Sequence, residues 1–98
     1  MEFEWDEAKN ESNRRKHGLS FDEAKLIFGG PLLTRVDDRE AYGEVREVSV
    51  GAIGEAVVLA VIHTDRDGRT RLISARHATR KERRLYHEHI GQAAQGTG

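Results

Sequence analysis

The sequence contains no cysteine, and its 98 residues include a single proline and a single tryptophan. Without cysteine the chain can form neither a disulfide framework nor a thiolate metal site. Its longest apolar run, residues 56–62, is far too short to span a bilayer. The acidic N-terminal segment also lacks the apolar stretch of a signal peptide. These absences predict a cytoplasmic protein without a membrane segment, and no metal or other cofactor is expected.

The composition is polar for a folded domain, with 37% hydrophobic and 34% charged residues. Apolar runs are nevertheless too frequent for a disordered chain. The length suffices for one hydrophobic core, and no internal repeat indicates a second unit. We therefore expect one domain over residues 1–90, followed by a flexible tail over residues 91–98, which is rich in Gly, Ala and Gln.

Positive charge is concentrated toward the C-terminal end, although the net charge of the chain is −1. Residues 69–89 contain seven Lys or Arg and two Glu, a local charge of +5, which leaves −6 for the remainder. A chain polarised in this way can present one face to a polyanion without being basic overall. The same run also fits a solvated helix that mixes Arg and Glu, so the charge alone leaves both interpretations open.

Local capping patterns predict two N-terminal helices. Asp6 can cap a first helix that runs to about Lys16, where Gly18 supplies a left-handed stop. Residues 20–23 form a capping box, and the apolar residues that follow lie on one helical face. This second helix should therefore pack in the core and end at residues 29–31, which contain two Gly and the single Pro.

Strands are expected next. Residues 56–63 are apolar on both faces, as is typical of a central strand. The intervals between strands are short, and residues 65–68 are typical of a hairpin turn, so sequential neighbours must be antiparallel. The expected strands cover residues 32–36, 45–53, 56–63 and 70–76.

A second capping box, from Thr79 to Glu82, opens a C-terminal helix that should continue to about Ile90, with Leu85, Tyr86 and Ile90 on its inner side. The predicted fold class is α+β. It comprises two N-terminal helices, an antiparallel meander of three to four strands and the C-terminal helix, either with or without an additional short N-terminal strand.

Two cations, Arg80 and Lys81, stand in the first turn of this last helix. Their charge opposes the helix dipole, so the stability of the helix alone would not favour them there. A phosphate bound at this end of the helix would make their electrostatic interaction favourable. Arg71 and Arg76 precede them on the last strand. Their spacing places them on opposite faces unless a bulge or the strand end intervenes.

Histidines supply the candidates for proton transfer, because their ordinary pKa lies near neutrality. His63 should project from the same face as Leu59 and Val61, His77 lies where the last strand meets the helix, and His17 ends the first helix. A lone histidine is more often structural than catalytic. No spacing of His and carboxylates suggests zinc, and Glu82 is better explained by capping and arginine pairing than by acid catalysis.

Two separated motifs resemble the BrnT toxin family. The N-terminal motif comprises Phe3, Glu4, Trp5, Asp6, Lys9, Asn13, Lys16, His17, Gly18, Phe21, Ala24 and Phe28. The C-terminal motif comprises residues 71–76 with Ala78, Thr79, Glu82, Arg83 and Tyr86, while Glu44, Arg46 and Gly51 fit the middle. The resemblance covers about residues 3–88. One departure is His77, where the family commonly has Lys.

The resemblance implies a RelE-like fold and a metal-independent endoribonuclease that cleaves RNA and arrests growth as the toxin of a type II toxin–antitoxin pair. It also implies a BrnA-like antitoxin, whose dimer bridges two toxins and binds DNA, so no direct DNA contact is expected from this chain. The alternative is a non-catalytic module of a small regulatory complex that binds RNA or protein through the same cations.

A ribonuclease of this kind must activate a 2′-hydroxyl, stabilise the phosphorane and protonate the leaving 5′-oxygen. We expect the catalytic residues to be Arg46, Arg71 and Arg76 as phosphate stabilisers, with His17 and His63 as base or acid. Lys16 is a further proton-transfer candidate and is expected to bind RNA together with Arg80 and Lys81.

Overall fold

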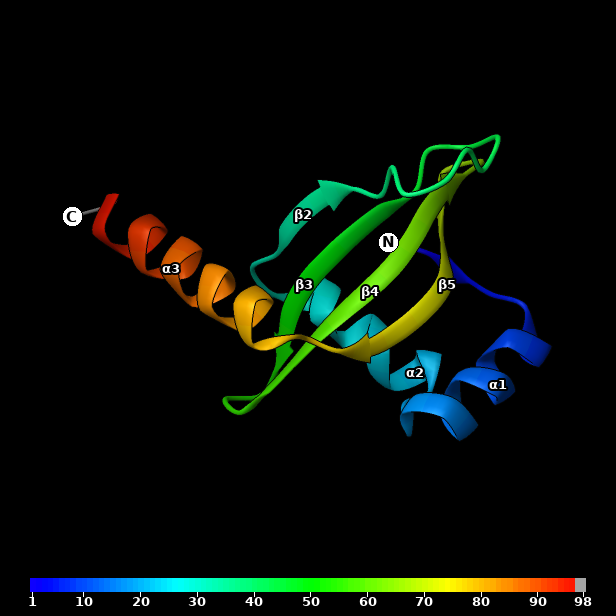
Figure 1. Ribbon diagram of the computed structural model, residues 1–98, viewed down its shortest axis with the longest axis horizontal. Helices are drawn as coiled ribbons and strands as arrows, with labels where there is room; N and C mark the ends of the chain where they lie inside the picture. The colour runs from blue at the N-terminus through cyan, green and yellow to red at the C-terminus, as the bar shows by residue number, and fades with distance from the viewer. Residues whose placement is uncertain (97–98) are drawn as a thin grey trace.

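The computed structural model describes residues 1–96 and forms one mixed sheet with helices at its N- and C-terminal ends (Figure 1). The elements in chain order are β1 (Phe3–Glu4), α1 (Glu7–His17), α2 (Phe21–Ala24), the 3-10 helix η1 (Lys25–Gly29), β2 (Leu33–Val36), β3 (Glu47–Ile53), β4 (Val57–Arg66), β5 (Arg69–His77) and α3 (Arg80–Gly96). The predicted α+β class is confirmed.

The sheet has five strands in the order β1-β5-β4-β3-β2, more than the three to four expected in the meander. Strands β2 to β5 are the predicted antiparallel meander, with β4 at the centre. The possible N-terminal strand exists as β1, but it runs parallel to β5 and makes the sheet mixed. Asp67 and Gly68 turn β4 into β5 with φ of 54° and 81°, as a two-residue hairpin turn with left-handed residues requires.

One face of the sheet is covered by the N-terminal helices, and we call it the covered face. Its core consists of Leu59, Val61, Leu72 and Ala75 from the strands, packed with Leu19, Phe21, Ala24 and Ile27. The chain that follows Ala24 tightens into η1 rather than continuing as an α-helix, yet it buries the predicted apolar side. Figure 1 shows α2 and η1 behind the strands.

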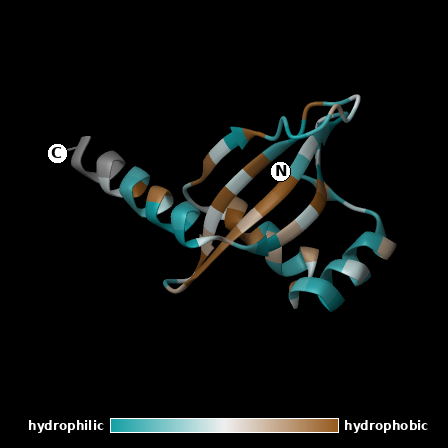
Figure 2. Cartoon of the chain, in the orientation of Figure 1, coloured by the Kyte–Doolittle hydropathy of each residue, from teal (hydrophilic) through white to brown (hydrophobic). Residues whose placement is uncertain are grey.

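The opposite face carries α3 at one end only, and we call it the open face. Its apolar floor consists of Val48, Val50, Val58, Ala60 and Ile62, with Tyr86 of α3 packed among them. Alternate residues of β3 and β4 thus supply the two cores, which explains the apolar bands along the strands in Figure 2.

Helix α3 begins at its predicted capping box, in which Thr79 N donates to Glu82 at 2.9 Å and Glu82 N donates to the Thr79 hydroxyl at 3.1 Å. Tyr86 is buried as predicted, and Leu85, although 38% exposed, lines a small hollow with Leu33 and Val50 on the sheet side of the helix. The helix continues to Gly96, beyond the predicted end at Ile90 and into the segment expected to be a tail. Residues 97–98 of that tail lie outside the described residues.

Helix α1 is hydrophilic along its length (Figure 2), and buried amides rather than apolar side chains attach it to the core. Asn10 Oδ1 accepts from the Phe21 amide at 2.8 Å. Asn13 Nδ2 donates to the Leu19 carbonyl at 3.0 Å, and its Oδ1 accepts from the Ala75 amide at 3.1 Å. No helix within residues 1–96 is both long and apolar enough to cross a membrane.

Candidate functional site

A β-bulge in β5 decides which face its arginines occupy. The register between β4 and β5 shifts by one residue, so Ile73 has no partner on β4. Arg71 pairs with Thr64 and Arg76 pairs with Ala60. These two partners are four residues, or roughly 13 Å, apart along β4 and project from the same side. Arg71 and Arg76 therefore both lie on the open face, and the bulge decides between the alternatives that their spacing left.

Arg46 joins them from the position immediately before β3. The Asp37 amide donates to the Arg46 carbonyl at 2.7 Å, which extends the β2–β3 ladder by one residue. Arg46 therefore projects from the same side as Val48, onto the open face. Its guanidinium lies 4.0 Å from the centroid of the Tyr42 ring, and its Nε donates to Glu44 at 3.2 Å. The structure thus brings the three predicted phosphate stabilisers to one face.

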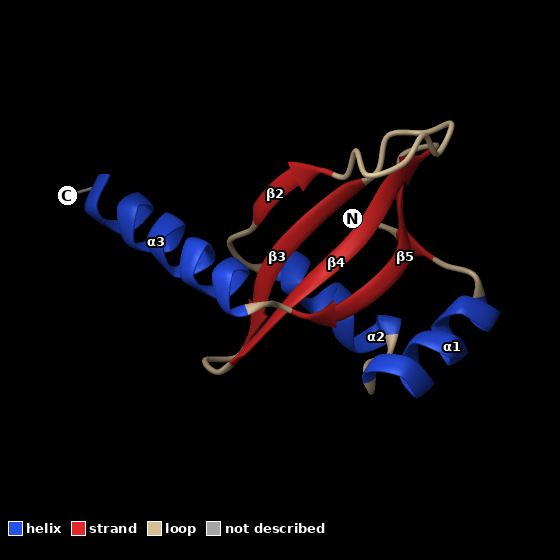
Figure 3. Ribbon diagram, viewed as in Figure 1, coloured by secondary structure: helices blue, strands red, loops and turns tan. Residues whose placement is uncertain are grey.

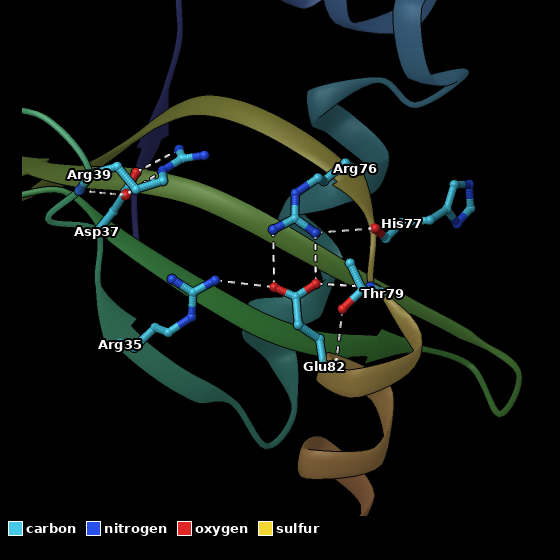
Figure 4. A network of polar contacts seen from close by, with 7 residues as sticks. All are labelled: Arg35, Asp37, Arg39, Arg76, His77, Thr79 and Glu82. Atoms are coloured by element: carbon cyan, nitrogen blue, oxygen red, sulfur yellow. Dashed lines mark hydrogen bonds and ion pairs between the residues drawn. The ribbon is translucent and has the colours of Figure 1, made fainter.

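Glu82 holds Arg76 in a bidentate ion pair (Figure 4). Arg76 Nη1 and Nη2 donate to the two carboxylate oxygens at 2.7 and 3.0 Å. Arg35 Nη2, from β2, donates to one of these oxygens at 3.2 Å. The hydrogen bond from Arg76 leads the contacts that lower the pKa of Glu82 to about 2, against the opposing effect of burial. The interpretation of Glu82 as a capping and pairing residue is therefore confirmed.

The other arginines of the open face also pair with carboxylates. Arg71 Nη1 donates to Glu4 of β1 at 2.7 Å. Glu44 accepts from Arg66 at 2.9 Å as well as from Arg46. Hydrogen bonds from Arg66 and then Arg46 hold the pKa of Glu44 below its ordinary value, although burial opposes them. Each cation thus has a counterion that a ligand must outcompete or share.

The loop between β2 and β3, residues 37–46, adds another pair (Figure 3). Asp37 is buried, and Arg39 Nε and Nη2 donate to its two oxygens at 2.7 and 2.9 Å. The Tyr42 hydroxyl donates to the same carboxylate at 3.3 Å. Hydrogen bonding by Arg39 lowers the pKa of Asp37 despite its burial. The ion pairs described so far join six arginines to four carboxylates, a net charge of +2.

His63 does not belong to this group, which corrects the expectation that it completes the site. It pairs with Leu72 on the covered face and is only 8% exposed. Its Nε2 lies 2.7 Å from Ser49 Oγ, and its ring meets Phe28 edge-on at 5.1 Å. Burial lowers its pKa, with Glu47 opposing the shift. His63 was placed on the correct strand face, but that face is filled by the core.

Lys16 and His17 lie at the end of α1, beside the bulge. With Asn13, Ile73 and Ser74 they line a depression of about 250 Å³ at the outer edge of β5. They are therefore next to the stretch of β5 that separates its two open-face arginines, but not on the open face itself. His77 is exposed at the end of β5, and its side chain points away from the Arg76–Glu82 pair (Figure 4).

Arg80 and Lys81 are exposed and line a shallow depression with Arg84. Arg80 and Arg84 are each two residues from Glu82, which at about 100° per residue places them on the opposite side of α3. Lys81 directly precedes Glu82 and lies on the flank of the helix, so the structure separates Arg80 and Arg84 from the open-face arginines. Within residues 1–96, no group of three or more His, Asp or Glu side chains is arranged to hold a metal ion.

The sequence interpretation missed four residues around the predicted arginines: Arg35, Arg39, Tyr42 and Arg66. Arg35 carried a usable signal, because it alternates with Leu33, which packs on the open-face core. Arg39 and Tyr42 lie in a loop without periodicity, so their positions depend on Asp37 and have no signal in the local sequence.

Fold and site together define a small α+β domain with an arginine-lined open sheet face. The model of one protein family, described as the ribonuclease toxin BrnT of type II toxin–antitoxin systems, matches residues 5–82. The chain belongs to this family, as its two motifs predicted.

A solved structure supports the assignment. The chain is similar to the crystal structure of the Brucella abortus ribonuclease toxin BrnT, with 26% sequence identity and a TM-score of 0.60. The match covers 82% of this chain and 99% of that chain. No curated protein matches the sequence.

Proposed function

We propose that this chain is the toxin of a toxin–antitoxin pair and acts as an endoribonuclease that needs no metal ion. One observation carries the proposal: in a member of a ribonuclease toxin family, the fold gathers Arg46, Arg71 and Arg76 on one open sheet face. Guanidinium groups are suited to this task, because they stay charged and their planar donors match phosphate oxygens.

In the proposed reaction, the 2′-oxygen of a ribose attacks the adjacent phosphorus while the bond to the 5′-oxygen breaks. The three arginines would stabilise the charge that develops on the phosphorane oxygens. Lys16 and His17 are the candidates for proton transfer, since they line the groove at the bulge between the two β5 arginines. Burial of His63 on the covered face leaves it a structural role.

The remaining parts of the proposal come from family membership. We propose a BrnA-like antitoxin as the protein partner, a RelE-like relationship of the fold, and the cytoplasm as the site of action. Arg80, on the outer side of α3, and Lys81, on its flank, would bind RNA that continues past this helix, since both are exposed.

Inducible expression with and without the adjacent gene tests the toxin assignment. Growth arrest that the neighbour relieves is the expected result. The purified chain should also cleave RNA in the presence of EDTA. A chain that binds RNA with a steep salt dependence, yet leaves it intact, would instead favour the non-catalytic module.

Arg76→Ala tests the site. Arg35 and the Thr79 amide still pair with Glu82 in this variant, so the protein should remain folded, as circular dichroism can verify. We expect loss of growth arrest and at least a roughly hundredfold slower cleavage, as for removal of one transition-state donor. Arg15→Ala, an exposed cation of α1, is the matched control. Full toxicity of a folded Arg76→Ala protein would refute the role of Arg76 as a phosphate stabiliser.

A further inference from the structure

Arg35 is an unassigned cation at the edge of the open face. It belongs to β2, the edge strand, and pairs with Val48, so it projects toward the same side as Arg76. Its side chain is 55% exposed, and its Nη2 lies 3.2 Å from Glu82 Oε2. Arg76 Nη2 lies 3.0 Å from that same oxygen. Two guanidinium groups from the first and last strands of the meander therefore meet at one carboxylate oxygen.

Two adjacent cations repel each other unless an anion lies between them. Glu82 supplies that anion, and its own position is fixed from the helix side by the Thr79 amide at 2.9 Å. Tyr86, one turn further along, is buried and donates its hydroxyl to the Pro31 carbonyl at 3.0 Å. The carboxylate is thus attached to an anchored helix turn and defines where both guanidinium groups stand.

The arrangement leaves donors and charge for a further anion. A guanidinium has five N–H donors. Among the contacts of residues 1–96, Arg35 uses only Nη2, and Arg76 leaves its Nε unused. Two cations against one carboxylate leave a charge of +1, which suits a phosphodiester that carries a single negative charge.

We propose that Arg35 and Arg76 form a clamp for one RNA phosphate and that Glu82 is the positioning residue that holds them side by side. This inference rests on the proposed function and deepens it, since it adds Arg35 to the RNA contacts and gives Glu82 a role beyond helix capping. Along the strands, Arg71 and Arg46 stand roughly 13 Å from Arg76 but only about 7 Å from Arg35. In the proposed function their long side chains extend toward this same phosphate from the other end of the open face.

Binding of a fluorescent single-stranded RNA tests the clamp. The RNA should carry 2′-O-methyl groups, so that no cleavage occurs, and fluorescence anisotropy gives the Kd over a range of salt concentrations. Arg35→Ala should bind about tenfold more weakly at low salt. The slope of log affinity against log salt should fall by about 0.7, as for loss of one phosphate contact with a single strand. Arg35→Lys should restore the slope but only part of the affinity.

Two comparisons make the result specific. Arg15→Ala removes an exposed cation from α1 and should change neither affinity nor slope. Glu82→Gln keeps an oxygen for the Thr79 amide but loses the anion between the guanidinium groups. Its kcat should fall roughly tenfold to a hundredfold, while KM stays equal or decreases. A purely structural role for Glu82 would predict a lower melting temperature without this split.

The outcomes separate the two proposals. If the wild type cleaves RNA but Arg35→Ala keeps its affinity and salt slope, the clamp is refuted and the proposed function stands. If the wild type neither cleaves nor binds RNA, the proposed function fails and the clamp fails with it. Arg35 makes only an exposed contact, so its variants fold and decide the matter even if Glu82→Gln is unstable.

Discussion

Replacing Asn13 with alanine should cost about 3 kcal/mol of folding free energy. The side chain is 6% exposed and serves two buried backbone groups, the Leu19 carbonyl at 3.0 Å and the Ala75 amide at 3.1 Å. Asn13→Ala leaves both without a partner. Each buried group without a partner costs about 1–3 kcal/mol, so the two together cost about 2–6 kcal/mol, and partial access of water places the loss in the lower half of that combined range.

Such a loss is large against the roughly 5–15 kcal/mol that stabilises a domain. It corresponds to a fall in Tm of about 12–24 °C, at about 4–8 °C per kcal/mol for a chain of this size. Urea unfolding can be followed by the fluorescence of Trp5, the single tryptophan. Its ring meets Phe21 edge-on at 6.0 Å, so the signal reports where the segment preceding α1 meets the core.

Ser12→Ala is the matched control, because Ser12 is the exposed neighbour on the same helix turn. It should change the unfolding free energy by less than about 0.5 kcal/mol. A loss below about 1 kcal/mol for Asn13→Ala, with an unchanged m value, would refute the argument that these two amide contacts hold α1 on the sheet.

Two further predictions concern the covered face. Burial lowers the pKa of His63 from 6.5, so the unfolded chain takes up its proton first as pH falls, and stability declines below about pH 6.5. His63→Gln should flatten that decline in urea unfolding and keep wild-type RNA cleavage at neutral pH; an unchanged decline would contradict the assignment. In Gly51→Ala, the new Cβ would lie 2.8 Å from Ile27 Cβ and 2.8 Å from Leu32 Cδ2. We expect a loss of about 1–3 kcal/mol in thermal unfolding, whereas Gly29→Ala, with nothing within 4 Å, should be nearly neutral.

The parts of the fold that depend on neighbouring residues were predictable. The caps at Asp6, Ser20 and Thr79 all form hydrogen bonds within their own turns, so their residue types identify the helix starts. The apolar residues on both faces of β4 likewise predicted a buried central strand. The end of α3 was missed because Gly91 and the residues after it lack periodicity, yet the helix continues through them.

The candidate site was harder to predict, because its geometry depends on pairing between distant strands. Periodicity placed His63 correctly beside Leu59 and Val61, but it could not say that this face is the one the helices cover. Arg35 reaches Glu82 across 47 positions of sequence, a contact without any local signal. The residue types indicated a phosphate-binding surface. Which of the cations lie together on that surface depends on the register of the paired strands.

The bulge at Ile73 has a consequence for comparing members of this family. A regular strand would place two arginines on one face when three residues separate them, and the bulge achieves the same with four. Shortening β5 by its unpaired residue would therefore keep Arg71 and Arg76 together, while straightening the strand at its present length would turn Arg76 toward the core. Relatives with either spacing are expected to have equivalent surfaces, and a motif that requires a fixed interval between the two arginines would overlook some of them.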